Sequence, residues 1–250
     1  MAAERKAYMT YVTCTFNTDH SNGTFDSAFS YAPLSADTCE ITGSMLADPA
    51  TLFIPDRAPD GRTVVAVGER AFERCTTVRT VVLPDTLEQI GSRAFAYCTS
   101  LVNLRVGINS RLTHIGKRAF MGCECLRVLR LGHVAGAVSL GSHAFAYCKR
   151  LCSVTLPNGM TELSPSAFEG CSALVHVRLP EQLVSICTSA FAACGSLVTL
   201  TLPATLRVIE DCAFAWCGHL TDLRLPEDTC IISASAFMDS PALSEILRAS

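Results

Sequence analysis

Apolar residues recur along most of this chain as Leu-x-x-Leu-x-Leu, usually followed by Pro, and another apolar residue comes seven to nine residues after the last leucine. In the repeat over residues 197–218, alternate residues such as Leu200 and Leu202 point to one side, which is typical of a short strand. Pro203 ends that strand because proline has no N–H to donate to a ladder. Each repeat is therefore predicted to contain a strand, a turn and a further buried apolar residue such as Ile209.

A second pattern, Ala-Phe-x-x-Cys, follows each of these units at steps of 23 or 25 residues. A period of this size indicates a solenoid, in which stacking of the repeats buries the core. Asp211 precedes the Ala213-Phe214 pair at a position suited to an N-cap, so we expect this part of each repeat to form a short helical turn. The repeated phenylalanines are Phe72, Phe95, Phe120, Phe145, Phe168, Phe191, Phe214 and Phe237.

The chain is expected to divide at about residue 50. Residues 50–250 form the repeat array, with a partial first unit followed by eight repeats of 23–25 residues, the last one incomplete. Residues 1–49 lie outside the period and are rich in aromatic residues, and Ser21-Asn22-Gly23 is a turn sequence. They are predicted to form a hairpin-like N-terminal cap, in which about the first ten residues are disordered.

The segment from Val78 to Cys98 resembles the repeats of the BspA-like, or treponemal-type, leucine-rich repeat family. The matching pattern is Leu-x-x-Leu-x-Leu-Pro-x-x-Leu-x-x-Ile-Gly-x-x-Ala-Phe-x-x-Cys. The resemblance implies an α/β repeat solenoid: a leucine-rich-repeat horseshoe with a parallel concave β-sheet and short helical turns on the convex side. Family members are often surface or adhesion proteins that bind other proteins, which implies a role such as host attachment. The family supplies no catalytic residues.

Composition narrows the class of protein further. Hydrophobic residues make up 49% of the chain and charged residues 17%, which fits a well-filled core. A net charge of −3 gives no general reason to expect nucleic acid as a partner. No long apolar run predicts a membrane span, and the first residues lack the apolar stretch of a secretion signal.

Cysteine occupies one fixed place in the repeat, three residues after the phenylalanine. A residue type that recurs at one structural position is expected to stack as a ladder, and cysteine packs well there as a small hydrophobe. Unbridged, buried thiols fit a reducing compartment and favour the cytoplasm, whereas the family resemblance leaves a surface or secreted location open. The ladder comprises Cys75, Cys98, Cys123, Cys148, Cys171, Cys194 and Cys217, and Ser240 takes the eighth place.

The most specific signal for binding is a column of arginines on the predicted concave face. Arg105 and Arg130 are neighbours in this column, and like charges on adjacent strands are destabilising by up to about 1 kcal/mol. An anionic group between them would relieve that repulsion and use their forked donors; the alternative is an ordinary solvated surface. The predicted partner-binding residues are Arg105, Arg130, Arg178 and Arg224, with Asn103 and His176 in the adjacent column.

Two neighbouring repeats carry a two-residue insertion after the strand, and both have glycine in place of proline. These loops would lie side by side next to Arg105 and Arg130, where they could form a small pocket. Surface loops also tolerate insertions without functional consequence, so the neutral interpretation stays open. The pocket residues would be Gly107, Ile108, Gly132, His133, Val134 and Val138.

Signatures of catalysis and of metal binding are weak. Cys123-Glu-Cys125 lacks the Cys-x-x-Cys spacing of a zinc site. Cys152 and His176 lie on adjacent predicted strands, but the sequence supplies neither an orienting group nor an oxyanion site for them. We therefore expect no enzyme activity, metal or cofactor.

The sequence is compatible with three functions. The leading hypothesis is a protein-interaction module that binds a partner on the concave sheet and adjoining loops. The first alternative is a carrier of a small hydrophobic or anionic ligand held at the two lengthened loops. The second is a scaffold that self-associates into a homo-oligomer through its C-terminal end, because Ser240-Pro241 is followed by a half-repeat without a polar cap.

Overall fold

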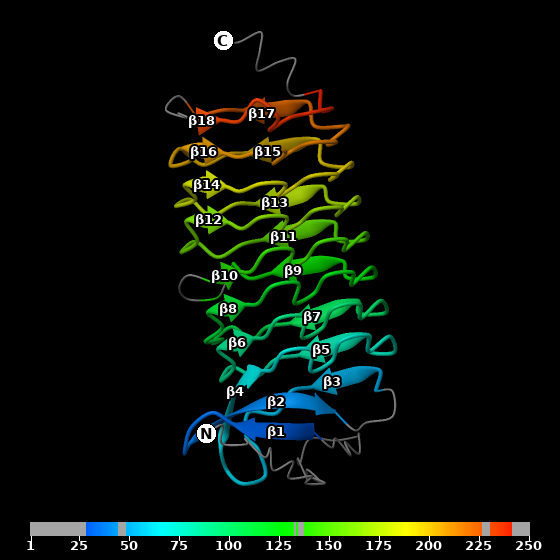
Figure 1. Ribbon diagram of the computed structural model, residues 1–250, viewed down its shortest axis with the longest axis vertical. Coiled ribbons are helices and arrows are strands. Elements are labelled where there is room, and N and C mark those ends of the chain that lie inside the picture. The colour runs from blue at the N-terminus through cyan, green and yellow to red at the C-terminus, as the bar shows by residue number, and fades with distance from the viewer. Residues whose placement is uncertain (1–28, 45–48, 133, 135–137, 227–230, 242–250) are drawn as a thin grey trace, which may run out of the picture.

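The computed structural model describes residues 29–44, 49–132, 134, 138–226 and 231–241. In these ranges the chain winds into successive coils that stack along the long axis of the molecule (Figure 1), and each full coil contributes one three-residue strand and one two-residue strand. The first coil differs in carrying the five-residue β4 (Thr63–Val67). The repeats predicted from the apolar pattern are therefore the coils of a solenoid.

The three-residue strands carry odd numbers. They are β3 (Thr51–Phe53), β5 (Thr80–Val82), β7 (Asn103–Arg105), β9 (Val128–Arg130), β11 (Ser153–Thr155), β13 (His176–Arg178), β15 (Thr199–Thr201) and β17 (Asp222–Arg224). Their outward side chains form what we call the odd-strand face.

The two-residue strands carry even numbers and follow the turn after each odd strand. They are β6 (Gln89–Ile90), β8 (His114–Ile115), β10 (Ser139–Leu140), β12 (Glu162–Leu163), β14 (Ser185–Ile186), β16 (Val208–Ile209) and β18 (Ile231–Ile232).

The odd strands are parallel and in register, as the constant repeat length predicts. Val154 of β11 is opposite Leu129 of β9 and Val177 of β13, so apolar side chains stack on the core side of every coil. The sheet is not continuous, however, because β3 to β13 form one six-stranded sheet and β15 with β17 a separate pair. In the described chain, the ladder bond from the N–H of Thr221 to the carbonyl of Val198 has no equivalent between β13 and β15.

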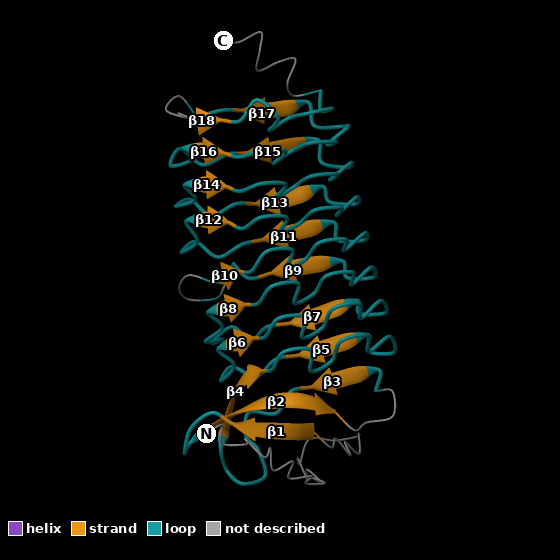
Figure 2. Ribbon diagram, viewed as in Figure 1, coloured by secondary structure: helices purple, strands orange, loops and turns teal. Residues whose placement is uncertain are grey.

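The predicted helical turns on the convex side are wrong: the described residues contain no helix (Figure 2). Alternate N–H groups donate to the next coil, for example Phe95 to Ala119 at 2.8 Å and Tyr97 to Met121 at 2.7 Å. The residues between them close tight turns, as in the bond from Ala96 to Arg93 at 3.0 Å. Because half of the donors bond to the neighbouring coil, the i to i−4 bonds of an α-helix cannot form.

These turns place residues, most of them not glycine, in the left-handed region at two fixed positions of each repeat. Arg93 has φ 56° and Tyr97 has φ 60°, and the same two positions recur along the array. Such conformations each cost of the order of 1 kcal/mol, which the bonds between coils offset. Asp211, expected to cap a helical turn, instead accepts a hydrogen bond from Ser235 of the next coil at 3.2 Å.

The repeated phenylalanines form one continuous stack through the core. Consecutive ring centroids from Phe72 to Phe237 are 5.1–5.7 Å apart, and the rings are inclined by no more than 12°. The two 25-residue steps, which flank Phe120, do not widen the stack, since both gaps are 5.1 Å. The inserted residues are therefore absorbed by the loops. At the N-terminal end of the stack, the ring of Phe29 packs edge-on against the ring of Phe72.

An antiparallel hairpin precedes the array. It consists of β1 (Phe29–Pro33) and β2 (Thr38–Ser44), and β2 continues into the even strands through parallel pairing with β4. The turn sequence Ser21-Asn22-Gly23, expected to belong to the hairpin-like N-terminal cap, lies outside the described residues.

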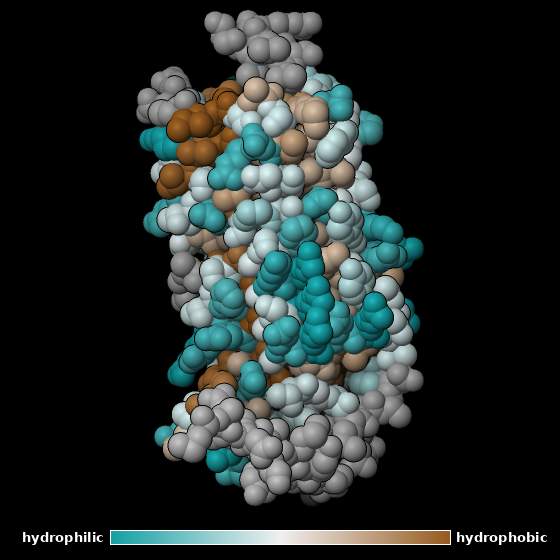
Figure 3. All heavy atoms as spheres, in the orientation of Figure 1, coloured by the Kyte–Doolittle hydropathy of each residue, from teal (hydrophilic) through white to brown (hydrophobic). Residues whose placement is uncertain are grey.

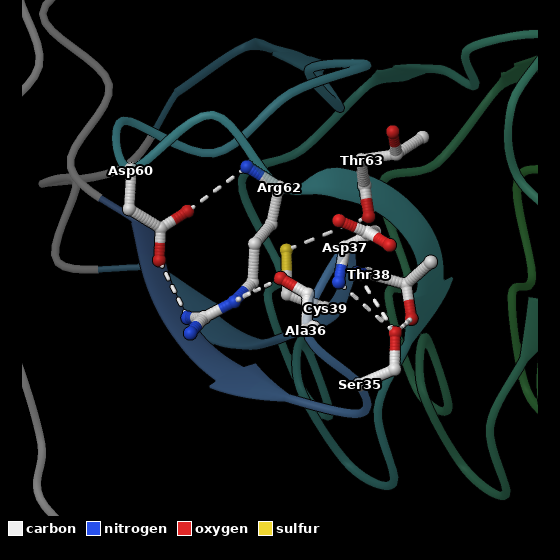
Figure 4. A network of polar contacts seen from close by, with 8 residues as sticks. All are labelled: Ser35, Ala36, Asp37, Thr38, Cys39, Asp60, Arg62 and Thr63. Carbon is white, nitrogen blue, oxygen red and sulfur yellow. Dashed lines mark hydrogen bonds and ion pairs between the residues drawn. The ribbon is translucent and has the colours of Figure 1, made fainter.

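Polar contacts join the hairpin to the loop before β4 (Figure 4). The guanidinium of Arg62 donates to the Asp60 carboxylate at 2.6 Å and to the carbonyl of Ala36 at 3.3 Å. The thiol of Cys39 donates to the carbonyl of Thr63 at 3.7 Å, and burial raises the pKa of this thiol. These bonds fix the first coil against the hairpin.

Candidate functional site

The odd-strand face presents the side chains that the sequence singled out. Because side chains alternate along a strand, the first and third residues of each odd strand point away from the core. All six predicted partner-binding residues are exposed at these positions: Arg105, Arg130, Arg178, Arg224, Asn103 and His176. The strands thus bring five of them together over β7 to β13, while Arg224 lies farther along on β17.

The register fixes which of these residues are neighbours. Asn103 is paired with Val128, which places Arg105 and Arg130 at equivalent positions of adjacent strands. Thr155 is paired with Arg130 on one side and with Arg178 on the other. A short hydroxyl side chain therefore separates two arginines on the same face.

Three further arginines extend this basic region and were missed by the sequence argument. Arg79 and Arg127 immediately precede β5 and β9, and Arg150 lies in the turn before β11; all three are exposed. Arg79 and Arg127 occupy the first variable position of Leu-x-x-Leu-x-Leu, and Arg150 immediately precedes the motif; neither position was assigned to the face. We call Arg79, Arg105, Arg127, Arg130, Arg150 and Arg178 the arginine surface.

A hollow of about 510 Å³ lies at one side of the arginine surface. Its lining combines three guanidinium groups with small polar side chains and the half-buried Cys125, whose sulfur is 3.9 Å from Nη1 of Arg150. Hydrophilic side chains gather over β5, β7 and β9 in the same part of the molecule (Figure 3). The lining residues are Thr77, Arg79, Ser100, Val102, Asn103, Cys125, Arg127 and Arg150.

The positive charge of the arginine surface is not neutralised locally. Within the described chain, ion pairs are formed by Arg62, Arg70, His143 and Lys149, and none involves an arginine of this surface. The nearby carboxylate of Glu124 is bound by Lys149 at 2.8 Å. Six guanidinium groups therefore face solvent without a carboxylate partner among the described residues.

A second hollow, of about 280 Å³, opens between Arg130 and Arg178. Thr155 forms its floor, and Gly132, Leu156 and Asn158 complete its lining. A Cβ atom added to Gly132 would lie 2.6 Å from Cγ2 of Thr155, so this close approach requires glycine.

The same column contains a similar hollow near the C-terminal end, with a different charge. It measures about 300 Å³ and is lined by Arg224 together with Asp222, the three residues of β15 and Leu202. A single arginine beside a carboxylate makes this hollow electrostatically balanced, in contrast to the one between Arg130 and Arg178.

Two apolar residues of the lengthened loops pack into the core. Val134 and Val138 are buried, with 5% and 1% of their surface exposed, so they pack inward and do not line an open pocket. Ile108 is 79% exposed, and a Cβ on Gly107 would collide with the Asp85 carboxylate. His133 lies outside the described residues. Of the predicted pocket residues that the structure describes, only Gly132 lines one of the two hollows on the basic face.

Burial disfavours the thiolate form of several cysteines of the repeats. The twelve described cysteines form no disulfide, and burial raises the pKa of the Cys123 and Cys148 thiols well above their ordinary value. Cys187 has its pKa raised to about 12, chiefly by burial. Among the described residues no three metal-ligating side chains gather, and in those ranges no helix is long and apolar enough to cross a bilayer.

Two columns of in-register parallel strands around a stacked apolar core define a β-solenoid of the leucine-rich repeat class. A family model described as BspA type leucine rich repeat region matches in six copies over residues 59–134 and 138–248. These matches cover well over half of the chain, so the protein belongs to the BspA-type leucine-rich repeat family. No curated protein matches the sequence.

Solved structures of bacterial leucine-rich repeat proteins share this fold. A Bacteroides ovatus protein has a TM-score of 0.75 and 26% identity over 88% of this chain, which spans 57% of that protein's length. The Treponema pallidum leucine-rich repeat protein has a TM-score of 0.67 and 28% identity, covering 77% of this chain and 87% of its own. A leucine-rich cell surface protein from Faecalibacterium prausnitzii has a TM-score of 0.62 and 24% identity, covering 89% of this chain and 74% of its own.

Proposed function

We propose that this protein is a non-enzymatic interaction module whose arginine surface binds an acidic protein partner. The observation that carries the proposal is the set of six exposed guanidinium groups without an ion-pair partner in the described chain. Arginine is suited to this role because its planar fork binds carboxylates through two parallel hydrogen bonds.

The shape of the face supports a protein partner in preference to an isolated small ligand. The basic groups are distributed over five strands, β5 to β13, and a surface of that extent matches the footprint of a protein better than a single cleft does. The rigid ladder holds the arginines at fixed spacing, which lowers the entropic cost of binding. The proposal extends to host attachment, which is motivated by the description of the Faecalibacterium prausnitzii protein as a cell surface protein.

Affinity capture with the intact protein tests the proposal. The wild type and the double variant Arg105→Glu/Arg130→Glu are immobilised and exposed to the same cell extract at several salt concentrations. We expect the variant to lose at least about 90% of the captured partner, because close charge pairs dominate recognition at such faces. Capture by the wild type is expected to weaken as salt rises.

The matched control is Arg111→Glu/Lys117→Glu, which makes the same change in net charge at two exposed residues outside the arginine surface. This control is expected to retain capture, and both variants are expected to unfold at nearly the wild-type temperature. Retained capture by Arg105→Glu/Arg130→Glu would overturn the proposal, as would equal losses in the two variants.

A second candidate function is self-association near the C-terminal end. Ile231 of β18 is 61% exposed, and apolar side chains gather over β16 and β18 (Figure 3). Residues 242–250, on which the sequence argument relied, lie outside the described chain. Light scattering over a range of concentrations tests this idea: an oligomer that Ile231→Ser dissociates supports it, and a monomer at every concentration removes it.

A further inference from the structure

We propose that the hollow between Arg130 and Arg178 is a specific site for a tetrahedral oxyanion, carried as a phosphate or sulfate ester by the partner protein. The inference deepens the proposed function, since it names the chemical group that one part of the arginine surface recognises. Binding of the isolated group can be measured without knowing the partner.

Arg130 and Arg178 are spaced so that they lie on either side of one recess. Arg130 and Arg178 are both paired with Thr155, so they lie two strands apart, about 10 Å between their backbones. A long side chain on each side of a short one leaves a recess, which is the hollow of about 280 Å³. Two guanidinium groups can converge over this recess from opposite sides.

The positive charge at the recess is unbalanced. Neither Arg130 nor Arg178 forms an ion pair with any described residue, so the recess is flanked by two uncompensated positive charges. A carboxylate carries one negative charge and would neutralise only half of this. A phosphate monoester carries about −1.5 to −2 at neutral pH and matches the pair. A sulfate ester carries a single negative charge, like a carboxylate, so its advantage is confined to its additional terminal oxygen.

The residues that line the recess offer more hydrogen-bond donors than a carboxylate has oxygen atoms. Each guanidinium can present two parallel N–H groups, and the hydroxyl of Thr155 and the amide of Asn158 also line the recess. A carboxylate offers two oxygen atoms to these donors. Phosphate and sulfate esters offer three terminal oxygens in different directions, which suits donors that surround the recess.

The recess between Arg130 and Arg178 coincides with an irregular repeat. Gly132 replaces the proline of most other repeats, and a Cβ atom added to it would lie 2.6 Å from the Thr155 methyl group. The equivalent hollow at Arg224 contains the Asp222 carboxylate, which would repel an anion. The two-residue insertion therefore coincides with the coil in which two arginines flank a recess without a carboxylate.

Calorimetric titration at constant ionic strength tests the site, with phenyl phosphate, phenyl sulfate and benzoate as probes of similar size. We expect phenyl phosphate or phenyl sulfate to bind at least tenfold more tightly than benzoate. Arg130→Gln and Arg178→Gln are each expected to weaken that binding at least tenfold. Arg224→Gln is the matched control, at the same position of another odd strand, and is expected to leave the affinity unchanged.

Three outcomes would overturn the site: no binding of either ester, binding of benzoate as tight as that of the esters, or wild-type affinity for the esters in the Arg130→Gln and Arg178→Gln variants. Treating the extract with phosphatase and sulfatase before affinity capture separates the ester on a protein from a free anion. Loss of capture after treatment supports the proposal. Capture that survives treatment, but is lost in Arg105→Glu/Arg130→Glu, overturns this inference and leaves the proposed function standing.

Discussion

The thiol of Cys123 donates a hydrogen bond to the main-chain carbonyl of Phe95, one coil earlier, over a distance of 3.2 Å. The same bond recurs in six coils, with sulfur-to-oxygen distances of 3.1–3.3 Å. The cysteine is therefore more than a small apolar filler, because in these six coils its thiol joins the coil to the preceding one.

Ser240 makes the equivalent bond at the end of the ladder and adds a second one. Its hydroxyl donates to the carbonyl of Phe214 at 2.6 Å and accepts from the N–H of Cys217 at 2.9 Å. Ser240→Ala should lower the free energy of unfolding by about 1–3 kcal/mol, because it leaves a buried N–H without an acceptor. Ser240→Cys should cost less, since a thiol can still donate to Phe214. Urea unfolding of both variants checks this, and equal losses would contradict it.

The ladder thiols should make the protein less stable at alkaline pH. Burial raises the pKa of Cys217 from 9.0 to about 12, so the folded state keeps a proton that the unfolded state releases. The corresponding stability is complete below pH 9.0 and is lost progressively as the pH rises toward about 12. Each such thiol contributes a slope of up to about 1.4 kcal/mol per pH unit.

Urea unfolding between neutral and alkaline pH measures that slope. Cys217→Ser removes the titrating group while keeping a hydroxyl donor, as position 240 does naturally. We expect a shallower decline of stability in this variant than in the wild type. Identical slopes would show that the Cys217 thiol does not contribute.

An aromatic ring and a glycine of consecutive coils fit together on the turn side. Gly122 has φ 72°, and a Cβ at this position would lie 2.6 Å from Cδ1 of Tyr97. Gly122→Ala should destabilise the protein by about 1–3 kcal/mol through strain and collision. Gly195→Ala is the control, because a Cβ at Gly195 has no other atom within 4 Å. Thermal unfolding distinguishes the two, and similar melting temperatures would contradict the prediction.

The phenylalanine stack should dominate the stability of the array. Phe145 is fully buried and stacks on a ring in each neighbouring coil, at 5.1 and 5.7 Å. Phe145→Ala should cost about 3–5 kcal/mol, as truncation of a buried aromatic residue usually does. Ile108→Ala, at a side chain that is 79% exposed, should change stability by less than about 0.5 kcal/mol. Denaturant titration of the two variants tests this contrast.

Repetition made the core predictable. Apolar side chains at one place in every repeat must stack on their own copies, so the strands, the phenylalanine stack and the cysteine ladder follow from spacing alone. The arginine column was predictable for the same reason, since strand alternation places Arg105 and Arg130 outside the core.

The helical turns could not be excluded from sequence, because local propensity does not reveal where backbone donors go. Phe95 and Tyr97 donate to the next coil, and that long-range bonding overrides any tendency of the segment to form a helix. The loops were misjudged for a related reason: the apolar Val134 and Val138 had a core to enter, and burial there is more favourable than exposure in a pocket.

By itself, the sequence determined the solenoid, its register and the basic character of one face, since a fixed period copies each side chain onto its equivalent in the next coil. Only the tertiary structure decided which arginines enclose a recess. That choice depends on what lies between them, and the register places the short Thr155 between Arg130 and Arg178. The tertiary structure also decided that the ladder thiols bond to the backbone of the preceding coil, because the carbonyl that each thiol reaches belongs to a residue 26 or 28 positions earlier in the chain.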